Sequence, residues 1–329
     1  MPIVRLPARS LPADASERDR LLAEYFAFER PATARGVNGA WEIEVLALAE
    51  PERWVDERLA EGLAWLGAPA DLALMGDSVR QEDGFTLALN DAWGLWSAAR
   101  WLQREGPADR VVILHADDHR DLSYPRLALD AGGYVDLISA TPVRLCEPGG
   151  VASAIRSGAV GMGSFLTPLV WETPQVELRH LKVGAASASL GIQRLTEADR
   201  VLSPGAPRPA IALTTAPSPG SSYTVTCSPE EWVALDIGGP VIVHIDLDYL
   251  NNRYNADSHW QDRPGRHDPS GHEVLDLFEG LLDALAQPQL ASRIVDIFVG
   301  ISPGFFPAEH WWPVIETCRL RLPRLRAAA

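Results

Sequence analysis

Short apolar runs alternate with stretches of helical periodicity along most of this chain. Val111-Val112-Ile113-Leu114 and Val241-Ile242-Val243 are runs typical of strands buried on both faces, and Ile294 to Ile301 forms a third. Apolar residues at helical spacing predict helices over 51–66, 92–102, 272–286 and 308–320. This succession of strands and helices predicts an α/β fold with a mainly parallel central sheet.

The remaining segments carry weaker patterns. Residues 1 to 15 are expected to form an extended lead-in, with Ser16 capping a helix that ends near Pro31. The segment at about 181–230 is small, polar and punctuated by proline and glycine, which predicts a loop-rich insertion or a hairpin. Neither a repeat nor a long linker divides the chain, so we expect residues 1–329 to form a single domain.

Composition limits the compartment and the partners. A net charge of −15 disfavours phosphate backbones and anionic membrane surfaces and favours cationic ligands. Cys146, Cys227 and Cys318 are widely spaced and form no Cys-x-x-Cys pattern, which fits a reducing cytoplasm. The first residues lack an apolar signal core, and no run approaches the roughly 20 apolar residues of a membrane span. We expect a cytoplasmic protein that binds neither nucleic acid nor membranes.

Metal-ligating side chains follow two of the expected strands. Asp117, His119 and Asp121 occupy alternate positions where the strand at about 110–116 ends, and alternate residues of an extended chain point the same way. Asp246 and Asp248 follow the strand that begins at Val241 in the same manner. Ligands of parallel sheets gather at the C-terminal ends of the strands, so we expect these side chains to meet.

Four carboxylates and one imidazole in one place require positive charge. Like charges a few ångströms apart raise one another's pKa, and two divalent ions would relieve this repulsion. An oxygen-rich set without thiolates favours Mn²⁺ first, then Fe²⁺, Co²⁺ or Mg²⁺, whereas zinc sites usually contain more histidine or cysteine. An isolated Asp-x-Asp after a strand is most often a turn or a helix cap, so the prediction of a metal site depends on both motifs together.

The two motifs resemble a known family. The runs His115 to Leu122 and Ile245 to Asp248 are similar to the metal signature of the ureohydrolases, which include arginases and agmatinases. The longer run His244 to Ser258 resembles the peptide arginases, which convert arginine to ornithine in ribosomally made peptides, since ordinary arginases continue with Gly-x-Asp-Pro. Ser302 to Phe305 and Ser164 to Pro168 fit the same family. The likeness covers about residues 85 to 310 and is strongest at the metal motifs.

The resemblance implies a three-layer α/β/α arginase-like fold and a role for each ligand. Asp117 and Asp246 would bridge two Mn²⁺ ions, Asp121 would complete the first metal, and His119 with Asp248 would complete the second. Ureohydrolases use a further histidine at the start of the preceding helix, but no histidine precedes His115 in this chain. Asp91 occupies that place and is the expected substitute. Its alternative role is a helix N-cap.

Catalytic and substrate-binding residues are less clearly marked. Arginase places a glutamate on the strand before an Asn-Pro, whereas the stretch from Phe298 to Pro303 has no acid. Candidates to replace it are Glu309 and Asp257, each of which could instead be a surface acid or a cap. His244 is the nearest candidate for the family's proton-shuttling histidine, or else it supports a ligand by a hydrogen bond. Residues that could bind peptide backbone or carboxylates, or simply form the loop, are Asn251, Asn252 and Arg253.

Four functions compete. The first is a manganese-dependent peptide arginase that hydrolyses arginine side chains of a precursor peptide to ornithine and urea. The second is a ureohydrolase for a free small guanidino compound. The third is a deacylase of the arginase/deacetylase fold, but that class uses one zinc ion and fewer acids, so Asp121 and Asp248 argue against it. The fourth is a peptide-binding relative without catalysis, and the retention of five metal ligands argues against that.

Overall fold

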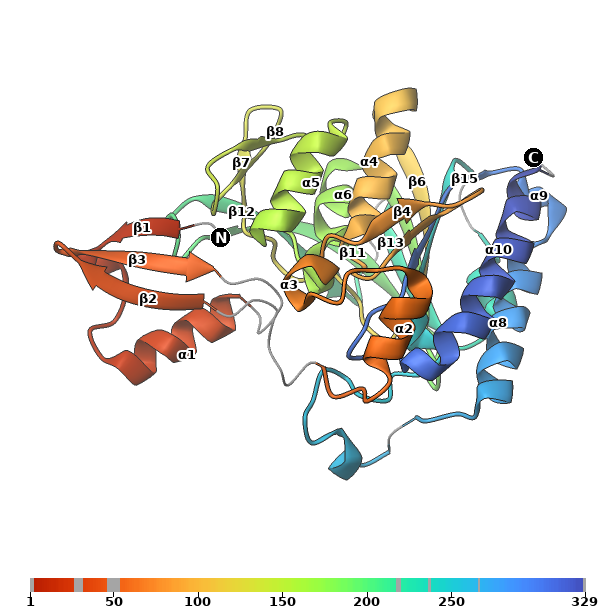
Figure 1. Ribbon diagram of the computed structural model, residues 1–329. Helices are drawn as coiled ribbons and strands as arrows, with labels where there is room; N and C mark the ends of the chain where they lie inside the picture. Colours follow the sequence, from red (N-terminus) through yellow and green to blue (C-terminus); the bar gives the residue numbers. More distant parts are fainter. Residues whose placement is uncertain are drawn as a thin grey trace.

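A nine-stranded mixed sheet forms the centre of the molecule (Figure 1). The computed structural model describes residues 3–26, 32–45, 54–216, 220–235, 238–265 and 267–327. The strand order is β12-β11-β13-β10-β6-β14-β15-β5-β4. The strands are β4 (Val79–Gln81), β5 (Thr86–Ala88), β6 (Arg110–Ala116), β10 (Gln175–Leu181), β11 (Ala188–Ala198), β12 (Pro207–Thr214), β13 (Ser222–Thr226), β14 (Val241–Asp246) and β15 (Ile294–Gly300).

The middle of this sheet is parallel. Each neighbouring pair from β13 through β10, β6, β14 and β15 to β5 runs parallel, whereas β4, β11 and β12 pair antiparallel at the two ends. The expected α/β class with a mainly parallel sheet is therefore confirmed. Parallel strands bring their C-terminal ends to one edge, where side chains that follow β6 and β14 must lie close together.

Hydrophobic cores lie on both faces of the sheet, which explains the continuous apolar runs. On β6, Val111 and Ile113 belong to one core and Val112 and Leu114 to the other, and all four are fully buried. Helices contributing to the first core are α4 (Trp93–Glu105), α5 (Pro148–Ser157) and α6 (Leu166–Glu172). Helices contributing to the second are α2 (Leu59–Leu66), α7 (Pro229–Trp232), α8 (Gly271–Leu285) and α10 (Trp311–Ala327).

The N-terminal residues form a small unit of their own beside this sheet (Figure 1). Strands β1 (Ile3–Pro7), β3 (Ala40–Val45) and β2 (Ala32–Val37) pair antiparallel, and α1 (Ala15–Tyr25) accompanies them. The expected lead-in is thus partly a strand. The sequence did not predict this strand because its partner, β3, lies more than 30 residues further along the chain. Asp14, rather than Ser16, caps α1 by accepting a 2.8 Å hydrogen bond from the N–H of Glu17. The expected helix end near Pro31 lies outside the described residues.

Two further segments differ from expectation. The helix expected over 51–66 begins only at Leu59, because the Asp56 carboxylate accepts hydrogen bonds from the N–H groups of Arg58 and Ala308 and holds a turn there. Residues 51–53 lie outside the described part. In the segment 181–230 the expected hairpin is confirmed and the loop-rich alternative is wrong, since β11 and β12 form an antiparallel hairpin that extends the sheet and β13 joins β10. Besides pairing, these strands contribute Ile192, Ile211 and Tyr223 to the first core.

Short elements complete the fold. Strands β7, β8 and β9 form a small antiparallel sheet, and none of the helices in the described residues is long and apolar enough to cross a lipid bilayer. These elements are β7 (Leu127–Asp130), β8 (Gly133–Asp136), β9 (Pro142–Val143), α3 (Leu72–Met75), α9 (Pro288–Ala291), η1 (Ala8–Ser10), η3 (Met162–Ser164), η4 (Leu247–Tyr249), η5 (Trp260–Asp262) and η6 (Ala308–His310).

Candidate metal centre

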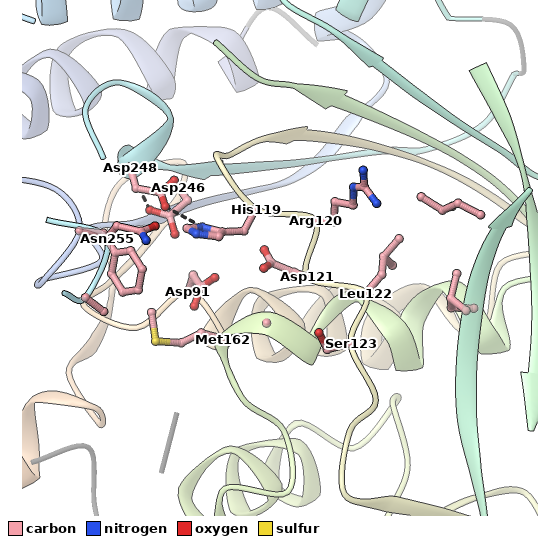
Figure 2. A pocket seen from close by; sticks show the side chains of 15 residues that line it. Asp91, His119, Arg120, Asp121, Leu122, Ser123, Met162, Asp246, Asp248 and Asn255 are labelled. Atoms are coloured by element: carbon pink, nitrogen blue, oxygen red, sulfur yellow. Dashed lines mark hydrogen bonds and ion pairs between the residues drawn. The ribbon is translucent and has the colours of Figure 1, made fainter. Parts of the chain in front are cut away.

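Acidic side chains from three strand ends meet at one cavity of about 670 Å³ (Figure 2). One follows β5, a group follows β6, and a pair follows β14, which is next to β6 in the sheet. The sheet therefore brings together residues that are far apart in sequence. Side chains of this set that line the cavity are Asp91, His119, Asp121, Asp246 and Asp248.

Asp117 belongs to three groups of potential metal ligands, one of which is completed by His115 and His244. One ligand atom from each of Asp117, His119 and Asp248 lies within 4.8 Å of the others, and the same holds for Asp91, Asp117 and Asp121. His119 Nδ1 lies 2.8 Å from Asp248 Oδ2 and 3.4 Å from Asp117 Oδ1. A carboxylate shared by two such groups is placed as a bridging ligand would be.

Within the described ranges, the protein leaves some of the buried carboxylate oxygens without a hydrogen-bond donor. The buried atoms Asp117 Oδ2 and Asp121 Oδ2 accept no hydrogen bond from the described residues. Burial, and then the charge of Asp248, raise the pKa of Asp117 to about 7. Burial and neighbouring carboxylates also raise the pKa of Asp121 and of Asp246 well above the usual range for aspartate. Bound cations would satisfy these oxygens, so the buried His and Asp groups suit a metal ion.

Asp91 lies close to Asp117 and Asp121. Asn90 Oδ1 accepts a 2.9 Å hydrogen bond from the N–H of Ala92 and so supports the start of α4. The Asp91 carboxylate instead belongs to the group with Asp117 and Asp121. Gly300 makes this position possible, since a Cβ on Gly300 would lie 3.0 Å from the Cβ of Asp91. The geometry favours a ligand role for Asp91 over a cap.

Hydrogen bonds orient the carboxylates that follow β14. Ser302 Oγ donates to Asp246 Oδ2 over 2.6 Å, and the N–H of Asp248 donates to Asp246 Oδ1 over 3.1 Å. The N–H of Asp118 donates to Asp248 Oδ1 over 3.0 Å. Such contacts fix which oxygen faces a metal, and sequence reasoning missed Ser302 because its partner lies on another strand.

Three buried histidines form a row behind the cluster. His180, His115 and His244 pair at the same register on β10, β6 and β14. His180 Nε2 donates to the carbonyl of Asp117 over 2.8 Å, and His115 Nε2 donates to that of His119 over 3.1 Å. Burial lowers the pKa of His180 to about 4 and of His244 to about 3. These imidazoles are neutral and support the backbone that carries two expected ligands.

His244 has a different position from the one expected of a proton shuttle. Its ring stacks on Phe298 with centroids 5.2 Å apart, and its Nδ1 lies 3.0 Å from His115 Nδ1. Since His115 Nε2 donates to a carbonyl, the neutral His115 ring accepts at Nδ1 and His244 donates. His244 is not among the residues that line the cavity. His244 therefore lies behind the cavity, in contact with His115 and Phe298 and grouped with Asp117.

Glu309 and the expected substrate-binding residues brace a loop. Arg253 forms ion pairs of 2.7 Å with both Asp268 and Glu309, and Asn251 Nδ2 donates to Asp268 over 3.2 Å. Asn252 Nδ2 donates to Asp118 Oδ2 over 2.8 Å. These residues hold the chain that follows β14.

Asp257 also has a local role, because its Oδ1 accepts a 2.8 Å hydrogen bond from the N–H of His259. The residues of this loop that reach the cavity are Asn255 and Ala256. The structure places the residues named from the sequence as substrate-binding candidates outside the lining of this cavity. Those that do not line the cavity are Asn251, Asn252, Arg253, Asp257 and Glu309.

The far side of the cavity is largely apolar. It contains residues of η3, just before α6, and of β12. No sequence motif marked Ile211 and Leu213 of β12, whose signal is apolar character at alternate positions of a strand. The further lining residues are Arg120, Leu122, Ser123, Met162, Gly163, Ile211, Leu213 and Phe305.

Comparison with known proteins adds no assignment. The sequence matches no protein-family model and no curated protein. The site is consequently defined by its own geometry: a set of oxygen and imidazole ligands beside a cavity with one acidic and one apolar side. This arrangement suits metal-assisted chemistry on a cationic group.

Proposed function

We propose that the protein is a manganese-dependent peptide arginase, which hydrolyses arginine side chains of a peptide to ornithine and urea. The observation that carries this proposal is that four acids and His119 line one cavity, with Asp117 grouped beside them, at the strand ends where the arginase-like motifs lie. Under this proposal, the sheet with helices on both faces is the three-layer arginase-like fold.

The ligands divide into two sets around shared carboxylates. Asp117 and Asp246 would bridge two Mn²⁺ ions, Asp91 and Asp121 would complete one, and His119 and Asp248 the other. The grouping of ligand atoms around Asp117 supports this division. Bound divalent ions supply a water acidic enough to act as a nucleophile at neutral pH and charge that stabilises the transition state.

The reaction consumes one water for each arginine. The water oxygen forms a bond to the guanidinium carbon, and the bond from that carbon to the side-chain nitrogen breaks. The nitrogen leaves as the amine of ornithine after taking a proton, and the carbon leaves in urea. Guanidinium is a resonance-stabilised cation, so carboxylate and amide oxygens around the cavity, such as those of Asp91 and Asn255, would hold it by hydrogen bonds.

The size and the lining of the cavity support a peptide over a free amino acid. A volume of about 670 Å³ lies in the range of roughly 300–1,000 Å³ that holds drug-sized ligands. Leu122, Ile211 and Leu213 give its far side an apolar surface suited to neighbouring peptide side chains.

Mass spectrometry tests the proposal. The protein, Mn²⁺ and a peptide containing one arginine should yield urea and a peptide lighter by one cyanamide-sized unit. Asp246→Asn should abolish this product, whereas Asp276→Asn, an exposed acid on α8, should leave it unchanged. Turnover of free arginine alone would contradict a peptide substrate, and the absence of urea from every guanidino compound would contradict the function itself.

A further inference from the structure

Arg120 places a cation on the rim of an otherwise acidic cavity. It is exposed and lines the same cavity as Asp121, but Figure 2 shows its side chain leaving in a different direction from the Asp121 carboxylate. In the part of the chain that the structure describes, no carboxylate forms an ion pair with Arg120, whereas nearby Lys182 is paired with Asp118 at 2.7 Å. Arg120 is thus available to a ligand.

A buried tyrosine lies beside Arg120. Tyr223, on β13, is fixed because its hydroxyl lies 2.6 Å from His180 Nδ1, and the Arg120 guanidinium lies beside it. Burial raises the pKa of Tyr223, and Arg120 acts in the opposite direction. A guanidinium has five N–H donors, so most remain free for a second partner after one contact with a hydroxyl.

The chemistry of that partner follows from geometry and charge. A planar guanidinium binds a carboxylate through two parallel hydrogen bonds, more specifically than any neutral group. The acidic cluster at the other side of the cavity attracts a cation. A ligand that meets both would carry a positive group and a negative group at opposite ends.

We propose that Arg120 is a specificity-determining residue that binds a carboxylate of the substrate, an inference that rests on the function proposed above. The carboxylate has three possible sources: an acidic residue beside the target arginine, the C-terminus of the peptide, or the α-carboxylate of a free amino acid. Each presents the same group to Arg120. Matched substrates separate them.

The experiment compares three pairs with the manganese-loaded full-length protein. The first pair is a blocked peptide with Glu or with Gln beside the arginine, the second is a peptide ending in a carboxylate or an amide, and the third is arginine or argininamide. The wild type should prefer the carboxylate member of at least one pair, and that pair identifies the source. Arg120→Gln should raise KM for that member about tenfold to a hundredfold and leave kcat and the other member unchanged.

Two further variants serve as controls. Arg120→Lys should restore part of the preference, because it keeps the charge but not the paired donors. Arg104→Gln removes the same charge from the exposed C-terminal turn of α4 and should change nothing. Equal kcat/KM within all three pairs, or an equal loss for both members in Arg120→Gln, would overturn the proposal.

Binding measurements keep the two proposals separate. If no guanidino compound is hydrolysed, the proposed function fails, and titration calorimetry with the same pairs then decides the role of Arg120. Tighter binding of a carboxylate member by the wild type, lost in Arg120→Gln, supports it. Equal binding of both members, or binding of neither, refutes it.

Discussion

Ser302 donates a 2.6 Å hydrogen bond to Oδ2 of Asp246, from the segment that follows the neighbouring strand. This contact fixes the orientation of a carboxylate that we assign to both metals. Losing such a contact typically costs about tenfold to a hundredfold in metal affinity. Ser302→Ala should therefore weaken Mn²⁺ binding by that factor in titration calorimetry. Ser292→Ala, which removes an exposed hydroxyl bonded to the carbonyl of Gln289, should not.

Asp91 and its neighbour Asn90 should have separable effects. Asp91→Ala should lower the number of tightly bound Mn²⁺ ions per chain, because it removes a ligand from the group with Asp117 and Asp121. Asn90→Ala should lower the free energy of unfolding by about 1 kcal/mol through loss of its bond to the N–H of Ala92, with metal content unchanged. Elemental analysis and chemical denaturation measure the two. Full metal content in Asp91→Ala would show that Asp91 is no ligand.

The free energy of unfolding of the metal-free protein should depend on pH, because the buried carboxylates lie close together. Burial raises the pKa of Asp117 from 3.8 to about 7, so the folded state binds a proton more tightly than the unfolded state. The associated stability is present below about pH 4 and is lost as the pH rises to about 7. This thousandfold change in acidity, at about 1.4 kcal/mol per tenfold, corresponds to roughly 4 kcal/mol.

Asp117→Asn removes this titration. Because the buried histidines are present in both proteins, comparing the variant with the wild type separates the effect of Asp117 from theirs. Without metal, the variant should gain stability over the wild type between pH 4 and pH 8, by up to about 4 kcal/mol. With Mn²⁺ the order should reverse, because only the wild type retains the ligand. Denaturation at both pH values, with and without Mn²⁺, provides the measurement. A stability difference that does not change with pH would contradict the raised pKa.

Gly300 is not a proposed ligand, but a larger residue at this position should weaken metal binding because Gly300 packs closely against Asp91. A Cβ there would lie 3.0 Å from the Cβ of Asp91, so Gly300→Ala should displace Asp91 and lower both metal affinity and stability, the latter by about 1–3 kcal/mol. Gly280→Ala, in α8, meets nothing within 4 Å and should raise stability by roughly 0.5–1 kcal/mol. Equal effects of both changes on metal affinity would refute this account.

Glu309 should matter little for the chemical step. It pairs with Arg253 and does not line the cavity, and a partly exposed ion pair contributes only about 0–1 kcal/mol. Glu309→Gln should thus lower kcat about fivefold or less. A loss of a hundredfold or more in steady-state kinetics would instead indicate a direct catalytic role.

Sequence patterns were sufficient for the central buried strands and for most residues of the cluster that could hold a metal ion. β6 and β14 are buried on both faces, so their apolar runs are continuous, and the acids at their ends fall at the same edge of the sheet by topology alone. The strands of the N-terminal unit and of the hairpin β11-β12 lack such runs. The strand β1 pairs with the more distant β3, which local sequence does not reveal, whereas β11 and β12 are neighbours in the chain and form the hairpin that was one of the two expectations.

The contacts of side chains outside the two motifs could be identified only from the structure. Glu309 and His244 were candidates because of residue type and position, but ion pairing with Arg253 and stacking on Phe298 give them other roles. His180 carried no signal, since its relation to His115 depends on strand register. Arg120 lies within the first motif, and only its direction and its lack of a carboxylate partner among the described residues distinguish it.

The order of the ligands along the chain has a consequence for biosynthesis. Asp91 and the residues after β6 emerge from the ribosome well before Asp246 and Asp248, and β14 inserts between β6 and β15 only after β15 has also been made. A nascent chain therefore holds only part of the coordination set. Under the proposed function, a metal that needs both motifs is bound only after β14 has been made, so metal binding follows assembly of the central strands rather than initiating it.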